Sequence, residues 1–368
     1  MRVLIAGGGT GGHLFPGIAL AEEILTRAPN RNDVLFVGTE RGLESKIVPQ
    51  SNYKLELIDV WGLKRVGPIG FVKGLFAIPR AILQSLAILR RYRPDVVVGV
   101  GGYASGPVVL AAWLAGIPTA VQEQNALPGF TNRVLSKIAS AVFTAFPAAA
   151  QHFPRKKVLL LGNPIRRQLL DNYLARAVPH EKFHLLVFGG SQGSHVLNQR
   201  MLEALPFLDS VRDKLVIVHQ TGEREVERVR EGYAKQAANA EVVSFISDMS
   251  GAYTRADVIV CRAGATTLAE LTVAKKAAIL IPFAAAADNH QELNARSLVD
   301  ADAAVMILEK DLTGERLAKE VFALMNPERR AQMEKAAGSL GHPEAAKEIA
   351  DVLVEMSQHR WGPEGRKA

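Results

Sequence analysis

The chain carries the same short pattern twice, and this repeat limits the folds that it can adopt. An apolar run, VLIA at residues 3–6, leads into the glycine loop GGGTGGH at residues 7–13. The run LLVF at residues 185–188 leads in the same way into GGSQGSH at residues 189–195, 182 positions further on. A strand that ends in glycines and precedes a helix is typical of phosphate-binding turns in α/β proteins. The repeat therefore predicts two similar α/β domains in tandem.

Apolar runs of strand length alternate with helical patterns in both halves. They occupy residues 34–38, 55–60, 96–100, 118–122 and 141–145, and then 215–219, 241–245, 258–261 and 278–281. This alternation predicts two α/β domains, each with a doubly wound, Rossmann-like parallel sheet. We expect the domains at residues 1–164 and 165–343, because Gly162-Asn163-Pro164 ends regular structure. A last helix at about residues 344–360 is expected to pack back on the first domain.

Composition excludes several classes of protein. At 368 residues the chain is too long for one typical core, which agrees with two domains. The single cysteine, Cys261, and the lack of an apolar leader predict a reducing, cytosolic compartment. No apolar stretch reaches the roughly 20 residues of a membrane-spanning helix. A net charge of +7 predicts an anionic partner, and an aromatic content of only 6% argues against nucleic acid.

The segment CRAGATTLAE, residues 261–270, carries the sharpest local chemistry. Small residues after a strand let the backbone approach a ligand, and a helix starting at the threonines offers N–H groups to a diphosphate. Glu270, in the first turn of that helix, would then accept hydrogen bonds from two adjacent ribose hydroxyls. A capping box formed by Thr267 and Glu270 explains the same residues equally well.

A second polar segment, DNHQELN at residues 288–294, follows the strand expected at residues 278–281. Its many hydrogen-bonding side chains suit a sugar with several hydroxyl groups. A solvated helix start that is capped by Asp288 is the alternative interpretation.

Two glycine loops of the first half are expected at the carboxyl ends of strands, where open α/β sheets bind ligands. The second of them is GGYASG, residues 101–106. The opening loop fits the dinucleotide pattern G-x-G-x-x-G only loosely, through Gly7, Gly9 and Gly12. The acidic residue that would bind a ribose after the second strand is missing, because the strand leads into Gly38 and Thr39. A dinucleotide site is therefore the second choice.

Seven motifs together resemble the MurG family of bacterial glycosyltransferases. They are GGTGGH (8–13), GGYASGP (101–107), QEQN (122–125), GNPIR (162–166), GGSQGS (189–194), CRAGATTLAE (261–270) and DNHQ (288–291). The resemblance implies the GT-B architecture, in which two Rossmann-like domains face a deep cleft. It also implies an inverting transfer without a metal or a cofactor. N-acetylglucosamine would move from UDP-GlcNAc to the C4 hydroxyl of the MurNAc of lipid I, undecaprenyl-diphospho-MurNAc-pentapeptide. The product would be lipid II for peptidoglycan, which links the chain to cell shape and cell division.

The resemblance assigns roles to individual residues. Glu270 would bind the ribose, residues 263–266 the diphosphate, and Phe245 and Ile246 would border the uracil. The full set for UDP-GlcNAc is Thr10, Gly11, Gly12, Asn125, Arg166, Ser191, Phe245, Ile246, Ala263, Gly264, Ala265, Thr266, Glu270, His290, Gln291 and Asn294. The diphosphate of lipid I would contact Gly8, Gly9, Gly101, Gly102, Tyr103 and Ser105.

Inversion needs a base that takes the proton of the attacking hydroxyl. His13 is the first candidate, because its reference pKa near 6.5 suits that task. An alternative role for His13 is to orient Thr10 or to contact phosphate. Glu123 is the alternative base. The helix start at Thr266 and the guanidinium of Arg166 would balance the charge of the departing UDP.

Residues 71–93 carry an apolar stripe and a basic face when they are drawn as a helix. Phe76 and Leu83 flank the basic face, which includes Lys73 and Arg80, and would enter a lipid interface. An ordinary surface helix is the alternative interpretation. The lipid-linked acceptor of the family favours a peripheral protein on the cytoplasmic face of the inner membrane. Its anionic surface and other cell-wall synthesis proteins would be partners.

Two other functions stay open. An enzyme of the same architecture, such as a UDP-GlcNAc 2-epimerase or a glycolipid synthase, would keep the UDP site of the second domain. A dinucleotide-dependent oxidoreductase or a nucleotide-binding regulator would bind NAD(H) instead of UDP. Nucleotide preference and the need for a lipid-linked acceptor separate both from the transferase.

Overall fold

A computed structural model describes the chain except for residues 61–67, 174–179, 359–360, 363–364 and 367–368. The chain forms two compact units, one of Met1–Arg167 with Pro343–Ala368 and one of Gln168–His342. It therefore leaves the first unit after Arg167 and returns to it at Pro343. The boundaries expected from the sequence, at residues 164 and 343, lie within three residues of these positions.

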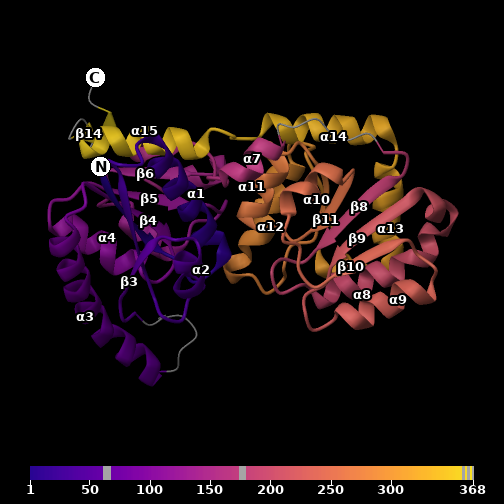
Figure 1. The fold of residues 1–368 in the computed structure, drawn as a ribbon, viewed down its shortest axis with the longest axis horizontal. Helices are drawn as coiled ribbons and strands as arrows, with labels where there is room; N and C mark the ends of the chain where they lie inside the picture. The colour runs from indigo at the N-terminus through magenta and orange to yellow at the C-terminus, as the bar shows by residue number, and fades with distance from the viewer. Residues whose placement is uncertain (61–67, 174–179, 359–360, 363–364, 367–368) are drawn as a thin grey trace. The chain divides into compact units, whose positions relative to one another are not determined.

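The first unit is built on a seven-stranded parallel sheet with the order β3-β2-β1-β4-β5-β6-β7 (Figure 1). Its strands are β1 (Arg2–Gly7), β2 (Asp33–Gly38), β3 (Lys54–Leu57), β4 (Val96–Gly101), β5 (Thr119–Glu123), β6 (Ala141–Thr144) and β7 (Val158–Leu160). Its helices are α1 (Gly11–Arg27), α2 (Glu44–Gln50), α3 (Pro68–Tyr92), α4 (Ser105–Leu114), α5 (Phe130–Leu135), α6 (Pro147–Ala150), η1 (Arg155–Lys157) and α15 (Ala345–Ser357). A short antiparallel pair, β14 (Trp361–Gly362) and β15 (Gly365–Arg366), follows α15.

The second unit is built on a six-stranded parallel sheet with the order β10-β9-β8-β11-β12-β13. Its strands are β8 (Phe183–Phe188), β9 (Leu215–Gln220), β10 (Ala240–Val243), β11 (Val258–Cys261), β12 (Ala277–Leu280) and β13 (Val305–Met306). Its helices are α8 (His195–Ala204), η2 (Leu205–Lys214), α9 (Val226–Lys235), α10 (Met249–Arg255), α11 (Ala265–Val273), η3 (Ala287–Asn289), α12 (His290–Val299), η4 (Glu309–Asp311), α13 (Gly314–Leu324) and α14 (Pro327–Ser339). The helix α7 (Arg167–Tyr173) starts at the boundary between the units.

Both sheets have the doubly wound topology that the sequence predicted, and this prediction is confirmed. Central strands such as β4 are buried along their whole length, because helices cover both faces of each sheet. The strand order reverses between β1 and β4 in the first unit and between β8 and β11 in the second. Open α/β sheets bind ligands at such points, beyond the carboxyl ends of the strands. All three glycine loops and the CRAGATT segment start at these four strand ends.

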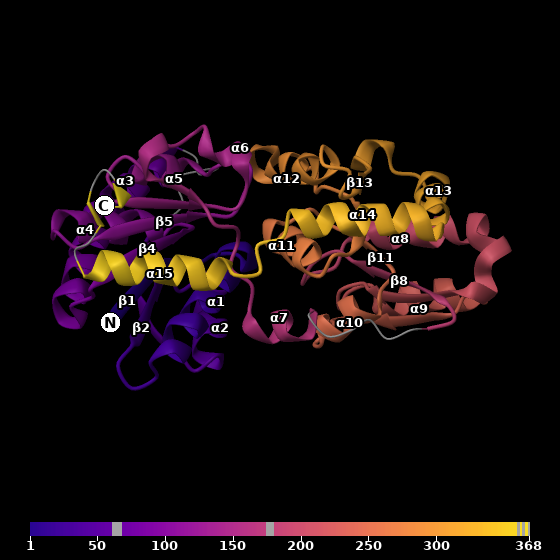
Figure 2. The ribbon, with the colours of Figure 1, turned by 90° about the horizontal axis from the view of Figure 1, so that it is seen from above.

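The last helix packs on the first unit. α15 lies along α1, as Figure 2 shows. Its residues Ile349, Ala350, Leu353 and Met356 are fully buried in the same apolar cluster as β1 and α1. An ion pair between Arg27 in α1 and an aspartate in α15, 2.6 Å long, adds a polar contact at its edge.

Two strands were missed, and two expected strands are shorter than predicted. β7 and β13 have only 3 and 2 residues, and their side chains are partly exposed, so no periodic pattern marks them. The strand expected at 55–60 ends at Leu57, and the one expected at 241–245 ends at Val243. Short edge strands carry too few buried positions to be recognised by hydrophobicity.

Candidate active site

In the second unit, the turn between β11 and α11 presents a helix N-terminus. Gly264 is the N-cap of α11, in an extended conformation and without a side-chain hydrogen bond. The first N–H groups of α11 therefore lack a capping side chain and are available to an anion. Ala263 and Ala265 are buried, so only small side chains line the backbone at this turn. The geometry suits a diphosphate at the position expected from the sequence.

Glu270 lies in the second turn of α11, whereas the sequence predicted the first turn. The helix starts at Ala265, which places Thr267 inside it. A capping box needs Thr267 at the N-cap, so that interpretation is wrong. Glu270 Oε2 instead accepts a hydrogen bond of 3.1 Å from the hydroxyl of Tyr253, a fully buried residue of α10. A buried phenol thus orients the carboxylate.

Arg262, directly after β11, connects four loops at this sheet edge and was not predicted as a site residue. Its guanidinium donates to Ser194 Oγ at 2.7 Å and to the carbonyl of Ile281 at 3.1 Å. It also forms an ion pair of 2.5 Å with Glu309, and the side chain is only 11% exposed. Burial lowers the pKa of Arg262, and Glu309 offsets part of that shift. One guanidinium therefore fixes the loops after β8, β11, β12 and β13.

The segment after β12 folds over this ion pair. Glu309 Oε2 accepts a hydrogen bond of 3.3 Å from the N–H of Ala284. Gln291 Oε1 accepts one of 3.0 Å from the N–H of Phe283, whose ring lies 5.3 Å from the guanidinium carbon of Arg262. The predicted donor-site residue Gln291 therefore also supports the loop in front of it.

Two consecutive residues before α12 adopt the left-handed backbone conformation. Asp288 has φ 52° and Asn289 has φ 54°, a conformation that costs roughly 1–2 kcal/mol for most residues and less for Asn and Asp. Asn289 is the N-cap of α12 and makes no side-chain capping bond, so the interpretation of a helix capped by Asp288 is wrong. His290 Nδ1 lies 2.7 Å from the carbonyl oxygen of Ala287, which places a proton on Nδ1. Such strain is concentrated at ligand-binding segments.

The other predicted donor residues of the second unit differ in exposure. Asn294 is fully buried and donates to the carbonyl of Ala263 at 3.3 Å, so it supports the turn between β11 and α11. Ser191 is exposed in the loop after β8. Phe245 is 63% exposed beyond the end of β10, and Ile246 beside it is half-buried. An exposed aromatic ring at this position offers a flat surface to a base.

A chain of hydrogen bonds runs behind the loop after β8. Buried His219 joins the hydroxyl of Tyr233 at 2.9 Å to Asn198 Oδ1 at 3.1 Å. The amide of Asn198 donates to Glu225 Oε2 at 2.6 Å, and Glu225 Oε1 lies 2.7 Å from Nδ1 of the exposed His195. Burial lowers the pKa of His219 to about 3, so its ring is neutral at neutral pH. The chain ties α8 to α9 and to the end of β9.

In the first unit, the opening loop uses two of its N–H groups internally. Gly8 donates to the carbonyl of Gly101 at 3.2 Å, and Gly9 donates to Glu44 Oε2 at 2.6 Å. The N–H groups of Gly8 and Gly9 are therefore already bonded within the protein, and the expected contact of these glycines with the lipid I diphosphate cannot use them. Thr10 is the N-cap of α1 and makes no side-chain capping bond, so the N–H groups at the start of α1 are the part of the loop that is available to an anion.

His13 lies in the first turn of α1 and rests on the second glycine loop. A Cβ atom on Gly101 would be 2.7 Å from Cδ2 of the His13 ring, so only glycine fits there. His13 Nδ1 lies 3.4 Å from Thr10 Oγ1. Gly102 approaches Gly8 equally closely, because its Cβ would be 2.4 Å from the Gly8 carbonyl oxygen. The two loops thus pack backbone against backbone beneath the histidine.

Tyr103 and Ser105 have opposite environments. Tyr103 is 54% exposed, as expected for a ligand contact. Ser105 is fully buried at the start of α4, and its Oγ lies 2.4 Å from the place of a Cβ on Gly99 in β4. Its hydroxyl therefore faces the sheet rather than a ligand, and the expected contact with the lipid I diphosphate does not fit this position.

Glu123, the alternative base, is 2% exposed, and its carboxylate accepts four hydrogen bonds. Its Oε1 accepts from both the N–H and the side-chain amide of Asn125, at 3.0 and 3.2 Å. Its Oε2 accepts from the N–H of Gly129 at 3.1 Å and from the amide of Asn132 at 2.9 Å. Burial raises the pKa of Glu123, while these bonds favour its charged form. The arrangement holds the loop of Asn125 and suits a structural carboxylate better than a base.

Arg166 lies beside the start of α1. Its guanidinium carbon is 5.0 Å from the centre of the Phe15 ring. A Cβ on Gly11 would be 2.9 Å from the same ring. The stacked pair therefore brings a cation to the helix N-terminus that the glycine loop presents.

The expected lipid-facing residues lie on α3. The side chains of Lys73 and Phe76 are outside the described residues. Leu83 is 68% exposed, and Arg80, equally open to solvent, forms an ion pair of 2.9 Å with Asp59. Among the helices that the structure describes, none is long and apolar enough to cross a membrane.

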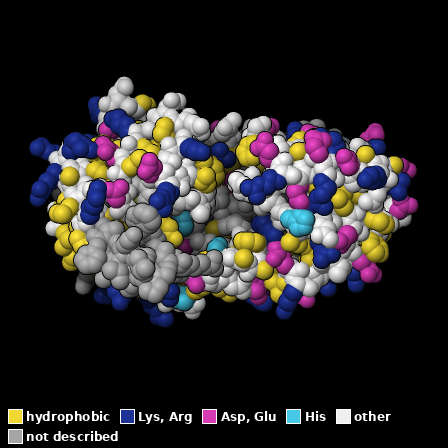
Figure 3. All heavy atoms as spheres, turned by 90° about the horizontal axis from the view of Figure 1, so that it is seen from below, with side chains coloured by type: hydrophobic (Ala, Val, Ile, Leu, Met, Phe, Trp, Pro, Cys, Tyr) yellow, Lys and Arg dark blue, Asp and Glu magenta, His cyan; other side chains and the backbone are white. Residues whose placement is uncertain are grey.

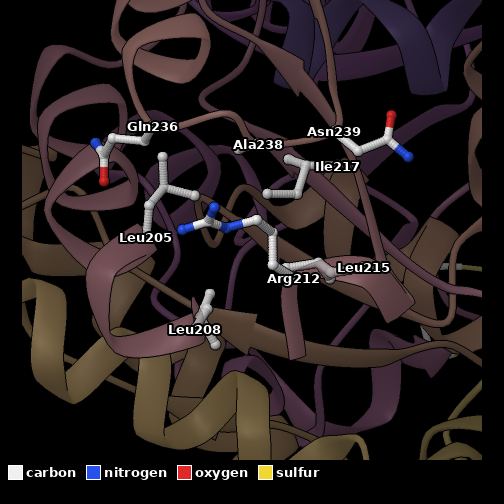
Figure 4. Close-up of a pocket in the computed structure, with 8 residues that line it drawn as sticks. All are labelled: Leu205, Leu208, Arg212, Leu215, Ile217, Gln236, Ala238 and Asn239. Carbon is white, nitrogen blue, oxygen red and sulfur yellow. The ribbon is translucent and has the colours of Figure 1, made fainter. Parts of the chain in front are cut away.

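A pocket between η2 and the start of β9 contains Arg212, whose side chain extends toward Leu205 in Figure 4. Its apolar lining consists of Leu205, Leu208, Leu215, Ile217 and Ala238.

On the face shown in Figure 3, Lys and Arg side chains are interspersed with Asp and Glu over both units. On the part of that face that is not drawn in grey, the positive charges are therefore not gathered in one patch.

Family models match both halves of the chain. The glycosyltransferase family 28 N-terminal domain matches residues 3–144, and the glycosyltransferase family 28 C-terminal domain matches residues 184–350. The first match lies in the first unit, and the second covers most of the second unit and continues to residue 350, in α15.

Curated relatives match over the whole length. A protein of Myxococcus xanthus is 64% identical and covers 100% of this chain and 96% of its own length. One of Geobacter sp. strain M21 is 51% identical, with 98% of this chain and 97% of its own length covered. Both are named UDP-N-acetylglucosamine--N-acetylmuramyl-(pentapeptide) pyrophosphoryl-undecaprenol N-acetylglucosamine transferase.

Solved structures share the fold. The crystal structure of Acinetobacter baumannii MurG has a TM-score of 0.81 at 33% identity and covers 96% of this chain and 99% of its own. The UDP-GlcNAc 2-epimerase of Neisseria meningitidis, solved with UDP-GlcNAc, has a TM-score of 0.67 at 14% identity, with 96% and 100% covered. The second likeness concerns the fold alone. From the full-length relatives and the matches in both halves, the chain belongs to glycosyltransferase family 28.

Proposed function

We propose that the protein transfers N-acetylglucosamine from UDP-GlcNAc to the C4 hydroxyl of the MurNAc of lipid I, which gives lipid II. The observation that carries this proposal is the α11 site, where an uncapped helix N-terminus stands six residues before a carboxylate held by Tyr253. The relatives named for this reaction match from end to end, which supports the same activity here.

The second unit binds the donor in this proposal. The N–H groups at the start of α11 receive the diphosphate, and the helix dipole favours its negative charge. Glu270 accepts hydrogen bonds from the ribose hydroxyls, because a carboxylate is an acceptor-only group. Phe245 borders the uracil, and Gln291 with His290 lies beside the sugar. Arg262 and Glu309 hold the loops that carry these groups.

The chemistry is an inverting displacement at the anomeric carbon. The C4 oxygen of MurNAc forms the new bond to C1 of GlcNAc, and the bond from C1 to the UDP oxygen breaks on the opposite face. The proton of the attacking hydroxyl passes to His13, and the negative charge of the departing UDP is stabilised by the start of α11 and by Arg166. Glu123 holds the Asn125 loop in place and takes no proton in this scheme.

The acceptor carries a lipid, so we place the protein on the cytoplasmic face of the cell membrane as a peripheral protein. Leu83 supports this placement, because a 68% exposed leucine three residues after the exposed Arg80 suits the boundary of an anionic bilayer. Vesicle binding should depend on anionic lipid and weaken in high salt.

The deciding experiment uses radiolabelled UDP-GlcNAc and a lipid I analogue with a short, soluble prenyl chain. Transfer of label to the analogue, with equimolar UDP release, is the expected result. UDP release or formation of a 2-epimer without acceptor would instead identify an epimerase. Binding of NAD(H) in preference to UDP would refute the donor-site assignment.

A further inference from the structure

Glu44 is a buried carboxylate under the opening glycine loop, and neither the proposed chemistry nor the sequence motifs account for it. It is the first residue of α2 and only 1% exposed. Its Oε2 accepts from the N–H of Gly9 at 2.6 Å. Its Oε1 accepts from the N–H and from the hydroxyl of Thr39, at 2.9 and 3.0 Å. A charge at this depth is stable only with such donors around it.

The chain makes room for this carboxylate with glycines at three separate places. A Cβ atom on Gly8 or on Gly38 would lie 2.3 Å from a side-chain atom of Glu44, and a Cβ on Gly42 would lie 2.0 Å away. These are distances that real Cβ atoms do not show. The three glycines come from the opening loop, from the end of β2 and from the turn before α2. Their shared consequence is a cavity shaped for one carboxylate.

The contacts of Glu44 extend to the proposed acceptor machinery in two steps. The carboxylate fixes Gly9, and the neighbouring Gly8 donates to the carbonyl of Gly101 at 3.2 Å. The ring of His13 rests on Gly101. A shift of the opening loop would therefore move the surface on which the histidine lies.

We propose that Glu44 is a positioning residue for the acceptor side of the transfer reaction. It holds the two glycine loops together so that His13 and the first N–H groups of α1 keep one arrangement. It also directs where the acceptor diphosphate binds. A negative charge hydrogen-bonded to Gly9 repels an anion at that residue, so the diphosphate is bound by the helix start at Gly11 and Gly12. This inference rests on the proposed function.

The second half of the chain contains a comparable glutamate. Glu225 precedes α9 and accepts from the amide of Asn198 at 2.6 Å, while its other oxygen lies 2.7 Å from His195 Nδ1. In both units, a glutamate that follows the second strand accepts a hydrogen bond from this region: Glu44 from the glycine loop, and Glu225 from the helix α8 after the glycine loop. A dinucleotide site would need that acid for a ribose. The internal comparison thus also argues against the dinucleotide alternative.

The test is Glu44→Gln. Glutamine keeps the size of the side chain, but its NH₂ group must face the N–H of either Gly9 or Thr39, and two donors cannot bond. We expect kcat/KM for the lipid I analogue to fall by roughly 10- to 100-fold, with the KM for UDP-GlcNAc changed by less than about 2-fold. Thr39→Val removes one donor and should give a smaller change in the same direction. Glu40→Gln, four positions before and exposed, is the matched control and should behave like the wild type.

Hydrogen exchange gives a readout that needs no activity. In the wild type the Gly9 amide should be protected, and Glu44→Gln should accelerate exchange over residues 8–13 while residues 263–270 stay unchanged. Unchanged exchange at residues 8–13, or equal rises in the KM of donor and acceptor, would overturn the role of Glu44. An inactive wild type would refute the proposed function, and the exchange data would still decide whether Glu44 holds the loop.

Discussion

The assignment of Glu270 to the ribose leads to a prediction that separates binding from structure. Glu270→Ala removes the carboxylate, while Tyr253→Phe removes only the hydroxyl that orients it, 3.1 Å away. UDP-GlcNAc analogues that lack the 2′ or the 3′ hydroxyl of the ribose remove the same hydrogen bonds by changing the substrate instead of the enzyme. For each deoxy analogue, wild type and Glu270→Ala tested with UDP-GlcNAc and with the analogue give the four combinations of a double-mutant cycle.

The magnitude follows from the number and kind of bonds. A hydrogen bond to a charged group contributes about 1.5–3 kcal/mol, and 1.4 kcal/mol corresponds to a factor of ten. Two ribose hydroxyls on one carboxylate therefore predict that Glu270→Ala lowers kcat/KM by roughly 10²–10⁴. Tyr253→Phe should cost only about 1 kcal/mol, because it removes one neutral donor and leaves the acceptor in place. Each deoxy analogue should lower the wild-type value by about 10- to 100-fold.

The assay is initial-rate transfer to the soluble lipid I analogue at low concentrations of UDP-GlcNAc. If Glu270 binds the ribose, the alanine variant loses little further activity with the deoxy analogues, because the partner is already gone. Equal sensitivity of wild type and variant to the missing hydroxyls would refute the reasoning. Equal losses in Glu270→Ala and Tyr253→Phe, with a matching loss of thermal stability, would reduce the pair to a packing contact.

Three further predictions concern the second unit. Arg262→Lys keeps the positive charge but loses the planar guanidinium, which bonds to several loops at once. In initial-rate kinetics, the KM for UDP-GlcNAc should rise about tenfold, while the KM for the lipid I analogue stays constant. Asn289→Val should destabilise the protein by more than about 1 kcal/mol, because a β-branched residue tolerates φ 54° poorly, whereas Asn289→Gly should stay near wild type in chemical denaturation. His219 has a folded-state pKa of about 3, below its ordinary 6.5, because burial favours the neutral ring. Its contribution to the free energy of unfolding is therefore complete above pH 6.5 and is lost as the pH falls toward 3, where the unfolded chain binds the proton more readily. Relative to wild type, His219→Gln should therefore flatten the decline of unfolding free energy on that acidic side, by an amount on the order of 4 kcal/mol over the whole range.

The fold could be predicted because its signals are local. β11 was placed at its observed bounds from an apolar run, and the glycine loops marked the strand ends at which ligands bind. The family resemblance was confirmed by relatives that match over the full length. The first residues of helices were predicted less accurately. The sequence places α11 at the threonines, but the small residues Gly264 and Ala265 let the helix start earlier, and this moved Glu270 by one turn.

The residues that support the sites were missed, because their partners are distant in sequence. Glu44 bonds to Gly9 across 35 positions, and Arg262 bonds to Ser194 across 68. Nothing in the segment around Glu44 separates it from the exposed Glu40 nearby. A weak signal existed for Arg262, since a charged residue directly after an entirely apolar strand must find a partner at the sheet edge. The three glycines around Glu44 are meaningful only once the fold brings them together.

The path of the chain also determines how the protein can be divided. The unit of residues 168–342 is an insertion within the other one, because α15 belongs to the first unit in space although it is last in sequence. A fragment that stops at residue 342 would lack the buried face of Ile349, Leu353 and Met356 and would expose α1 to water. The inserted unit, in contrast, is one continuous segment of the chain. A minimal form of the first unit therefore requires residues 1–167 joined by a linker to the C-terminal helix, rather than a simple truncation.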